Sequence, residues 1–229
     1  MQIAGLQKSS LLDYPSKIAA VIFTLGCNFR CPYCHNPNLI TAVSSHSLFD
    51  ETAVFNFLKQ RQGKLDAVVV SGGEPSLQKD IAEFFRKIKD LGYLAKLDTN
   101  GTNPDVIKRL VNEKLVDYIA MDIKSPLNKY EQTVCRSIDI GKISESIEFI
   151  MSCSVEYEFR TTVVRSQLDI LDFENIGKTL KGAKRYYLQK FRSDITLNPN
   201  FSKEQTYTDM EFEKIQSILK SYIDEVLIR

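Results

Sequence analysis

Three cysteines near the N-terminus are the side chains in this chain that are best suited to chemistry. Cys27, Cys31 and Cys34 have a C-x3-C-x2-C spacing and directly follow an apolar run over residues 19–25. A thiolate is a soft ligand that suits zinc or an iron–sulfur cluster. A cluster of four irons normally takes four cysteines, so three would leave one iron open to a ligand that is not protein. The spacing therefore predicts a metal centre of the catalytic kind, which keeps one position free.

Two other interpretations of these thiols stay open at this point. A structural zinc site would need a fourth ligand, and His35, Cys135 or Cys153 could supply it. Unligated thiols are also common in protein cores. The core interpretation is the weaker of the two, because Arg30 and Pro32 interrupt the thiols and are typical of a loop. The other histidine, His46, is interpreted as a solvated loop residue.

The composition is that of a globular protein without a strong electrostatic field. The chain has 229 residues, a net charge of +1, 43% hydrophobic residues and 26% charged residues. This charge favours neither nucleic acid nor an anionic membrane as a partner. No apolar run approaches the ~20 residues that span a bilayer, and the N-terminus lacks the pattern of a secretory signal. Five cysteines, an odd and clustered set, favour a reducing cytoplasm.

Apolar strand-like runs alternate with amphipathic helical runs along the chain, which is typical of parallel βαβ units. The clearest helix carries Ile81, Phe84, Phe85 and Ile88 at helical spacing and ends at Gly92. Comparable helices are expected between the other strands. The pattern predicts strands at residues 19–24, 67–71, 94–98, 118–122, 157–164 and 185–191.

Six such units are too few to close an eight-stranded barrel. The predicted fold is therefore α/β, an open TIM-like partial (β/α)6 barrel with a mostly parallel, curved sheet. We expect a single domain over residues 1–229, with a short N-terminal extension at 1–18 and a C-terminal helix at 208–223. In barrels of this kind, functional side chains gather at the carboxyl ends of the strands.

Two short polar motifs follow the second and third expected strands. The first is Ser71-Gly72-Gly73-Glu74-Pro75, in which two glycines let the backbone approach a ligand and the acid could accept from an ammonium group. The second is Asp98-Thr99-Asn100-Gly101. A plain β-to-α turn and an Asx-type turn are the structural alternatives for these motifs.

Charged residues lie on or just after the fourth and fifth expected strands. Asp122 and Lys124 come at the end of the fourth strand and point the same way. Arg160 lies in the fifth strand among apolar neighbours, where an unpaired charge would be costly. The alternatives are a structural ion pair between Asp122 and Lys124, and pairing of Arg160 with Glu156 or Glu158.

The cysteine motif resembles the signature of the radical S-adenosylmethionine (SAM) superfamily, with the aromatic Tyr33 just before the third cysteine. The string Tyr-Cys-His-Asn-Pro at residues 33–37 is similar to that of enzymes that activate glycyl-radical proteins. Residues 5–15 and 23–31 resemble the family of activating proteins of anaerobic ribonucleoside-triphosphate reductase more closely still. The similarity covers most of the chain; it is dense over residues 3–39 and thin beyond Arg165.

This resemblance implies two cofactors, a 4Fe-4S cluster and SAM. Cys27, Cys31 and Cys34 would hold three irons, and SAM would bind the fourth through its amino and carboxylate groups. The Gly-Gly-Glu motif would hold the SAM amino group, and the arginine would contact SAM. The SAM-binding residues implied in this way are Tyr33, Gly72, Gly73, Glu74, Asp98, Thr99, Asn100, Lys124 and Arg160.

The resemblance also implies a small monovalent cation that Asp98 and Asp122 would bind near the SAM carboxylate. Two acids facing a ligand carboxylate would otherwise repel one another. The sixth strand departs from the family pattern, because it lacks the histidine that contacts SAM in some activators. Gln189 or Phe191 is the candidate to flank the adenosine there, and His35 is expected beside the cluster without being a ligand.

The function implied is that of an activating enzyme. It would cleave SAM reductively to methionine and a 5′-deoxyadenosyl radical, which would take a hydrogen atom from a glycine of a partner. The expected partners are anaerobic ribonucleoside-triphosphate reductase, a glycyl-radical enzyme, and flavodoxin or ferredoxin as electron donor. The alternatives are an activator of another glycyl-radical enzyme, a small-molecule enzyme of the deazaguanine-synthase type, and a non-catalytic zinc-binding module.

Only one cluster is expected, because the two remaining cysteines, Cys135 and Cys153, are too isolated to hold a second one.

Overall fold

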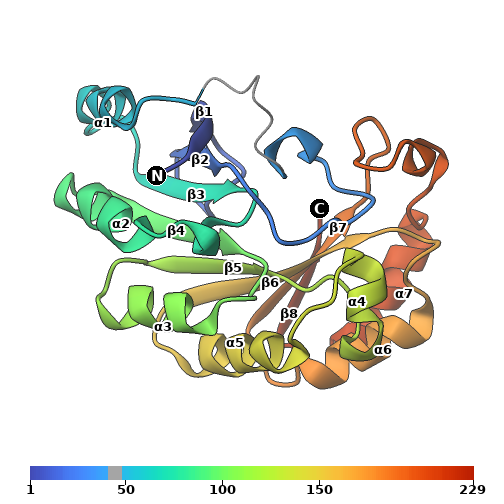
Figure 1. Ribbon diagram of the computed structural model, residues 1–229. Coiled ribbons are helices and arrows are strands. Elements are labelled where there is room, and N and C mark those ends of the chain that lie inside the picture. Colours follow the sequence, from blue (N-terminus) through green and yellow to red (C-terminus); the bar gives the residue numbers. More distant parts are fainter. Residues whose placement is uncertain (41–47) are drawn as a thin grey trace.

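The centre of the computed structural model is one curved sheet of eight strands (Figure 1). The structure describes residues 1–40 and 48–229; the predicted loop residue His46 lies outside the described residues. The first strand runs antiparallel to the second, and the other neighbouring pairs are parallel. The strands follow one another in sequence order: β1 (Ile3–Ser10), β2 (Ala19–Thr24), β3 (Ala67–Gly72), β4 (Leu94–Thr99), β5 (Tyr118–Asp122), β6 (Glu156–Val163), β7 (Arg185–Lys190) and β8 (Glu225–Ile228).

Helices connect the parallel strands and lie outside the curved sheet (Figure 1). Side chains cap several of them; Asp50 and Thr208, for example, accept hydrogen bonds from backbone amides in the first turns of α1 and α7. In the described part of the chain, no helix is long and apolar enough to cross a membrane. The helices are α1 (Glu51–Gln60), α2 (Ile81–Asp90), α3 (Pro104–Asn112), α4 (Tyr130–Val134), α5 (Ile140–Ser152), α6 (Ile170–Thr179) and α7 (Asp209–Leu219).

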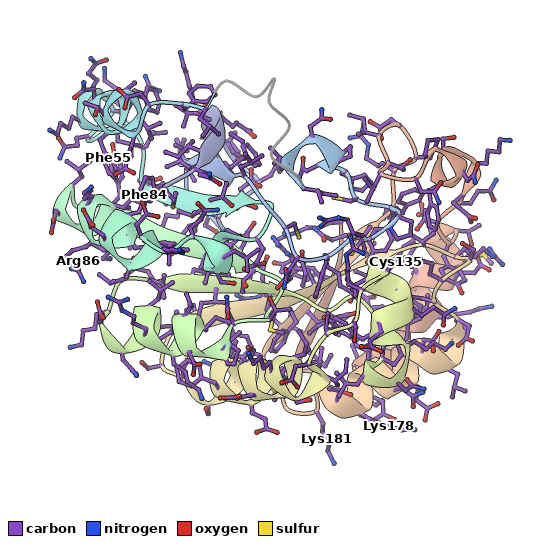
Figure 2. The ribbon with its side chains drawn as sticks, in the orientation of Figure 1. Phe55, Phe84, Arg86, Cys135, Lys178 and Lys181 are labelled. Atoms are coloured by element: carbon purple, nitrogen blue, oxygen red, sulfur yellow. The ribbon has the colours of Figure 1, made fainter. Side chains whose placement is uncertain are left out.

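Both faces of the central strands are buried, which explains their continuous apolar runs. On β3, Val68 and Val70 belong to the main core under the helices, whereas Val69 packs inside the barrel with Tyr14 and Tyr118. The outer core continues between the helices, where the rings of α1 and α2 lie side by side at the positions labelled Phe55 and Phe84 (Figure 2).

The predicted α/β partial barrel is confirmed. The six predicted strands correspond to β2–β7, with ends that differ by at most one residue. The strand order runs from β1 to β8 without a pairing between these two strands in the described chain, so the sheet is open. The carboxyl ends of β2–β7 therefore meet on one side, where the polar motifs are expected.

Three elements differ from the prediction. Residues 3–10, predicted as part of an extension, form the edge strand β1, whose mixed exposure leaves no clear alternation in the sequence. The last helix ends at Leu219 rather than at residue 223, and the chain then forms β8. With only four residues, β8 is too short to show a period. The short helix α4 was likewise absent from the prediction.

Candidate active site at the carboxyl ends of the strands

A cavity of about 280 Å³ lies at the carboxyl ends of the strands. It brings together every residue for which the sequence predicts a site role, from the cysteine loop to the fifth parallel strand. Asp13, His35 and Gln189 also line it, whereas Phe191, Cys135 and Cys153 are not among its lining residues. The predicted residues that line it are Cys27, Cys31, Tyr33, Cys34, Gly72, Gly73, Glu74, Asp98, Thr99, Asn100, Asp122, Lys124 and Arg160.

The loop that carries the cysteines is held by its backbone. The amide of Cys27 donates to the carbonyl of Ile40 at 3.1 Å, and the amide of Arg30 donates to the carbonyl of Val134 at 2.9 Å. The Arg30 guanidinium also donates to the carbonyl of Cys27 at 2.6 Å. Because these bonds use main-chain atoms and one arginine, they fix the path of the loop without engaging a thiol.

Burial determines the protonation state of two of the three thiols. It raises the pKa of Cys27 to about 12 and that of Cys31 to about 11, so both are protonated at neutral pH in the absence of a metal. Metal binding would have to release these protons. Cys135, by contrast, is exposed just after α4 (Figure 2), and Cys153 is only partly buried.

The donor set suits a cluster with one open position. Three thiols of a single loop face one cavity, and thiolates are the ligands that iron–sulfur clusters use. In the described residues, no group of three or more histidine, cysteine or acidic side chains is arranged to hold a metal ion. The same finding applies to the three thiols, so it does not distinguish an open cluster from a closed zinc site.

The glycine pair after β3 allows the strand end to pack against the cysteine loop. A Cβ atom on Gly73 would lie 2.0 Å from the carbonyl oxygen of Gly26, and one on Gly72 would lie 2.4 Å from the amide nitrogen of Thr24. Gly72 also has a φ of +113°, which disfavours other residues. The pair thus places backbone groups of β3 directly beside the start of the cysteine loop.

The Glu74 side chain is fully committed to the protein. Its carboxylate accepts hydrogen bonds from the Thr99 hydroxyl at 2.7 Å and from the amides of Asn100 at 2.6 Å and Ser76 at 3.0 Å. Burial raises the pKa of Glu74, although these hydrogen bonds oppose the shift. Glu74 therefore ties the end of β3 to the end of β4 and fixes both predicted motifs relative to one another.

The charged residues of β4–β6 form a connected ionic network. The Arg160 guanidinium contacts Asp122 at 2.8 Å and Asp98 at 3.2 Å, rather than Glu156 or Glu158. Lys124 contacts the other oxygen of Asp122 at 3.0 Å. Burial alone would raise the pKa of Asp122, but Arg160 and Lys124 outweigh it and hold that pKa at about 2.

This network corrects one prediction. A monovalent cation between Asp98 and Asp122 is not supported, because the Arg160 guanidinium bridges the two carboxylates. The repulsion that a cation was expected to relieve is relieved by a side chain of the protein.

Sequence analysis did not identify Lys96 as part of this region. Its side chain is only 1% exposed, and its ammonium group lies 3.1 Å from Asp98 and donates to the carbonyl of Asp13 at 2.6 Å. A lysine inside the apolar strand Leu94–Thr99, two residues before Asp98 and hence on the same face, was the available signal.

Residues just after β7 contact the cysteine loop at His35. The ring of His35 stacks on Phe191 with centroids 5.7 Å apart, and its Nε2 atom is 2.8 Å from the carbonyl of Arg192. His35 therefore joins the cysteine loop to the end of β7. Gln189 is the one of the two adenosine candidates that lines the cavity.

Comparisons with known proteins agree with this arrangement. The family model of the radical SAM superfamily matches residues 21–180. A protein of Methanocaldococcus jannaschii, named as a glycyl-radical enzyme activating enzyme, is 39% identical over 99% of this chain and 95% of its own length. The pyruvate formate-lyase-activating enzyme of Streptococcus mutans is 33% identical over 84% of this chain and 79% of its own length.

A solved structure shows the same fold. SuiB of Streptococcus suis bound to S-adenosylmethionine superposes with a TM-score of 0.70 at 12% identity, over 91% of this chain and 49% of that one. The radical SAM family implies a 4Fe-4S cluster and SAM as cofactors, and the three thiols beside an open cavity fit both. From its match to the family model and its similarity to named activators, the chain belongs to the radical SAM superfamily, in the family of glycyl-radical enzyme activating enzymes.

Proposed function

We propose that this chain installs a glycyl radical on anaerobic ribonucleoside-triphosphate reductase. The observation that carries the proposal is the single cavity in which three thiols of one loop face the charged ends of β4–β6. Bound there, the cluster and SAM supply one-electron cleavage of SAM and a radical that can take a hydrogen atom from a glycine Cα. The protein supplies binding, orientation and electrostatics.

In this proposal Cys27, Cys31 and Cys34 hold the cluster and leave its fourth iron to SAM. The path of the loop, set by its backbone hydrogen bonds, would position the three thiols for the cluster. The thiols lose their protons when the metal binds, which burial otherwise disfavours.

SAM would lie between the loop and the strand ends. Lys124 and Arg160 line the cavity and would bind its carboxylate, and the backbone at Gly72 and Gly73, which also lines the cavity, would bind its amino group. Glu74 acts here by fixing that backbone, since its own oxygens already accept three hydrogen bonds. Tyr33, Thr99, Asn100, Asp98 and Asp122 complete the binding surface.

The choice of partner rests on two stretches of sequence. Residues 5–15 and 23–31 resemble the activators of the anaerobic reductase more than those of other glycyl-radical enzymes. A flavodoxin or ferredoxin would supply the electron. The clustered free thiols favour a reducing, cytoplasmic setting for this chemistry.

An electron paramagnetic resonance experiment tests the partner. The anaerobically reconstituted protein is mixed with SAM, a reductant and the anaerobic reductase subunit, and the spectrum is recorded. We expect the doublet of a glycyl radical on the reductase. A preparation that cleaves SAM but gives no doublet on this subunit would contradict the assignment of the partner and leave the cleavage chemistry standing.

Pyruvate formate-lyase is a second candidate partner, favoured by the similarity to the Streptococcus mutans activator. The same mixture with pyruvate formate-lyase in place of the reductase separates the two. A doublet on the lyase alone would identify this chain as its activator. A product from a deazaguanine precursor, with no doublet on either protein, would instead favour the small-molecule alternative.

A further inference from the structure

Lys96 is a buried charge that the proposed roles leave unexplained. Its side chain is 1% exposed in β4, two residues before Asp98, which lines the cavity. A lysine is almost never buried this fully unless its charge is matched. Here the ammonium group lies 3.1 Å from Asp98 and 3.9 Å from Glu158, and it faces the ring of Tyr118.

Lys96 faces the carboxylate oxygen of Asp98 that has no hydrogen-bond partner among the described residues. Asp98 uses its Oδ2 atom to contact Arg160 and to accept from the Ser71 hydroxyl. Its Oδ1 atom is buried and makes no hydrogen bond with the described residues, and the Lys96 ammonium lies beside it. Burial alone would raise the pKa of Asp98, but Arg160 and Lys96 outweigh it and lower that pKa.

The carboxylates around Asp98 are matched by side-chain charges without an added ion. Four positive groups, Lys96, Lys124, Arg160 and Arg229, contact three carboxylates, those of Asp98, Asp122 and Glu158. Glu158 is itself fully buried and also accepts from the Tyr118 hydroxyl at 2.9 Å. A further cation beside Asp98 would have to displace the Lys96 ammonium or remain uncompensated in a buried place.

We propose that Lys96 is a built-in substitute for a monovalent cation, so that SAM binding in this protein is independent of sodium and potassium ions. Lys96 acts as a positioning residue: it holds Asp98 in place, and Asp98 in turn orients the Arg160 guanidinium toward the cavity. This role rests on the proposed SAM site. The same ammonium donates to the carbonyl of Asp13, which ties residues 11–18 across the interior of the barrel.

The first test changes only the salt. SAM binding to the anaerobically reconstituted protein is measured by equilibrium dialysis in potassium, sodium or choline chloride at equal ionic strength. We expect the same dissociation constant in all three. Binding that requires potassium or sodium would overturn the proposal, because an external ion would then be necessary despite Lys96.

The second test removes the charge. Lys96→Met, or Lys96→Gln if the first variant does not fold, should raise the dissociation constant for SAM in choline chloride by about 10-fold or more, the effect of losing an outer-shell partner. Potassium or sodium should restore part of this loss. Wild-type affinity in choline chloride for a folded variant would overturn the proposal.

A matched control is Lys129→Met, since Lys129 pairs with Asp172 at 2.8 Å away from the cavity. This variant should bind SAM like the wild type in every salt.

A third readout needs neither cluster nor SAM. The thermal unfolding midpoint of the cluster-free wild type should be equal in the three salts, whereas that of Lys96→Met should be lower and rise in potassium or sodium. If the wild type bound no SAM under any condition, the proposed function would fail, yet these unfolding midpoints would still decide whether Lys96 replaces an ion. A wild-type midpoint that depends on the cation would contradict the replacement.

Discussion

The two walls of the cavity are built in different ways. The cysteine loop, residues 26–36, is fixed by its backbone, through bonds such as that from the Cys27 amide to the Ile40 carbonyl. The charged wall, which consists of Asp98, Asp122, Lys124 and Arg160 and is supported from outside the cavity by Lys96, lies on or just after strands whose register is set by the sheet. Its side chains are fixed by one another through ion pairs.

Because of this difference, the loop and the charged wall have separate tasks: the loop would bind the metal, and the wall sets the charge around the cavity. Main-chain bonds hold the loop, although the Cys27 thiol also accepts from the Phe29 amide at 3.4 Å, so Cys31 should be replaceable without loss of the fold. A wall held by mutual charges gives each residue a structural role as well as a binding role, because removing one partner of a buried pair leaves the other uncompensated. Substitutions in the two walls should therefore separate activity from stability.

The largest effect on activity is expected in the loop. Cys31→Ala should reduce SAM cleavage by more than about 100-fold, because it removes a cluster ligand. Loss of a residue that only supports a ligand costs up to about 100-fold. Its thermal unfolding, measured without cluster, should stay close to that of the wild type. Cys135→Ala is the matched control and should keep activity, since Cys135 is exposed and does not line the cavity. Substantial turnover by Cys31→Ala would refute the assignment of the ligands.

A substitution in the charged wall should lower both the stability of the protein and its affinity for SAM. Arg160→Met leaves Asp98 and Asp122 facing one another without their shared guanidinium, and we expect unfolding to become easier by about 3–5 kcal/mol. SAM binding should be lost together with this stability, as measured by urea unfolding and dialysis. Arg160→Lys keeps the charge and should lose less. A stable Arg160→Met protein would show that the wall is not held by its ion pairs.

Glu74 connects the two kinds of wall, and its replacement should have a smaller effect. In Glu74→Gln, an NH2 group replaces one carboxylate oxygen and cannot accept a hydrogen bond. Either the Thr99 hydroxyl or the Asn100 amide then loses its acceptor, and leaving this buried donor unpaired costs about 1–3 kcal/mol. Urea unfolding measures this cost. Glu83→Gln, on the exposed surface of α2, is the control and should be nearly neutral. Equal stability of the two variants would contradict the tie between β3 and β4.

The smallest effect is expected in the dependence of stability on pH. The pKa of Asp122 is about 2 in the folded protein against an ordinary value of 3.8, so its ionisation stabilises the fold above pH 4. That contribution is lost as the pH falls from about 4 to about 2. The free energy of unfolding of the wild type should fall more steeply over this range than that of Asp122→Asn. If the free energies of unfolding of the two proteins changed with pH in parallel, ionised Asp122 would not stabilise the fold.

The strands and the cavity residues were predictable because each rests on a local signal. The runs that became β2–β7 are apolar and bounded by turn residues, and a parallel sheet places their polar ends together. The Cys27–Cys34 spacing is visible without any structure. These signals predicted the fold and the polar strand ends, whereas the choice of SAM-binding residues came from the resemblance to the radical SAM superfamily; all of them line one cavity.

The relations among charges were not predictable, because they depend on register between strands. Arg160 lies opposite Asp122 in the pairing of β5 with β6, whereas the sequence offered Glu156 and Glu158 as nearer partners. The predicted cation failed for the same reason, since neither the bridge by Arg160 nor the approach of Lys96 is visible within one strand. The edge strands β1 and β8 carry too little periodicity to be recognised.

The most direct test of the account is the electron paramagnetic resonance spectrum of the reduced, reconstituted protein before and after SAM is added. If three cysteines leave one iron open, SAM must bind that iron and change the spectrum of a single 4Fe-4S cluster, and Lys124→Met should weaken the change. A spectrum that SAM leaves unaltered, or a colourless protein that binds one zinc ion, would contradict the open position on which the proposed function rests.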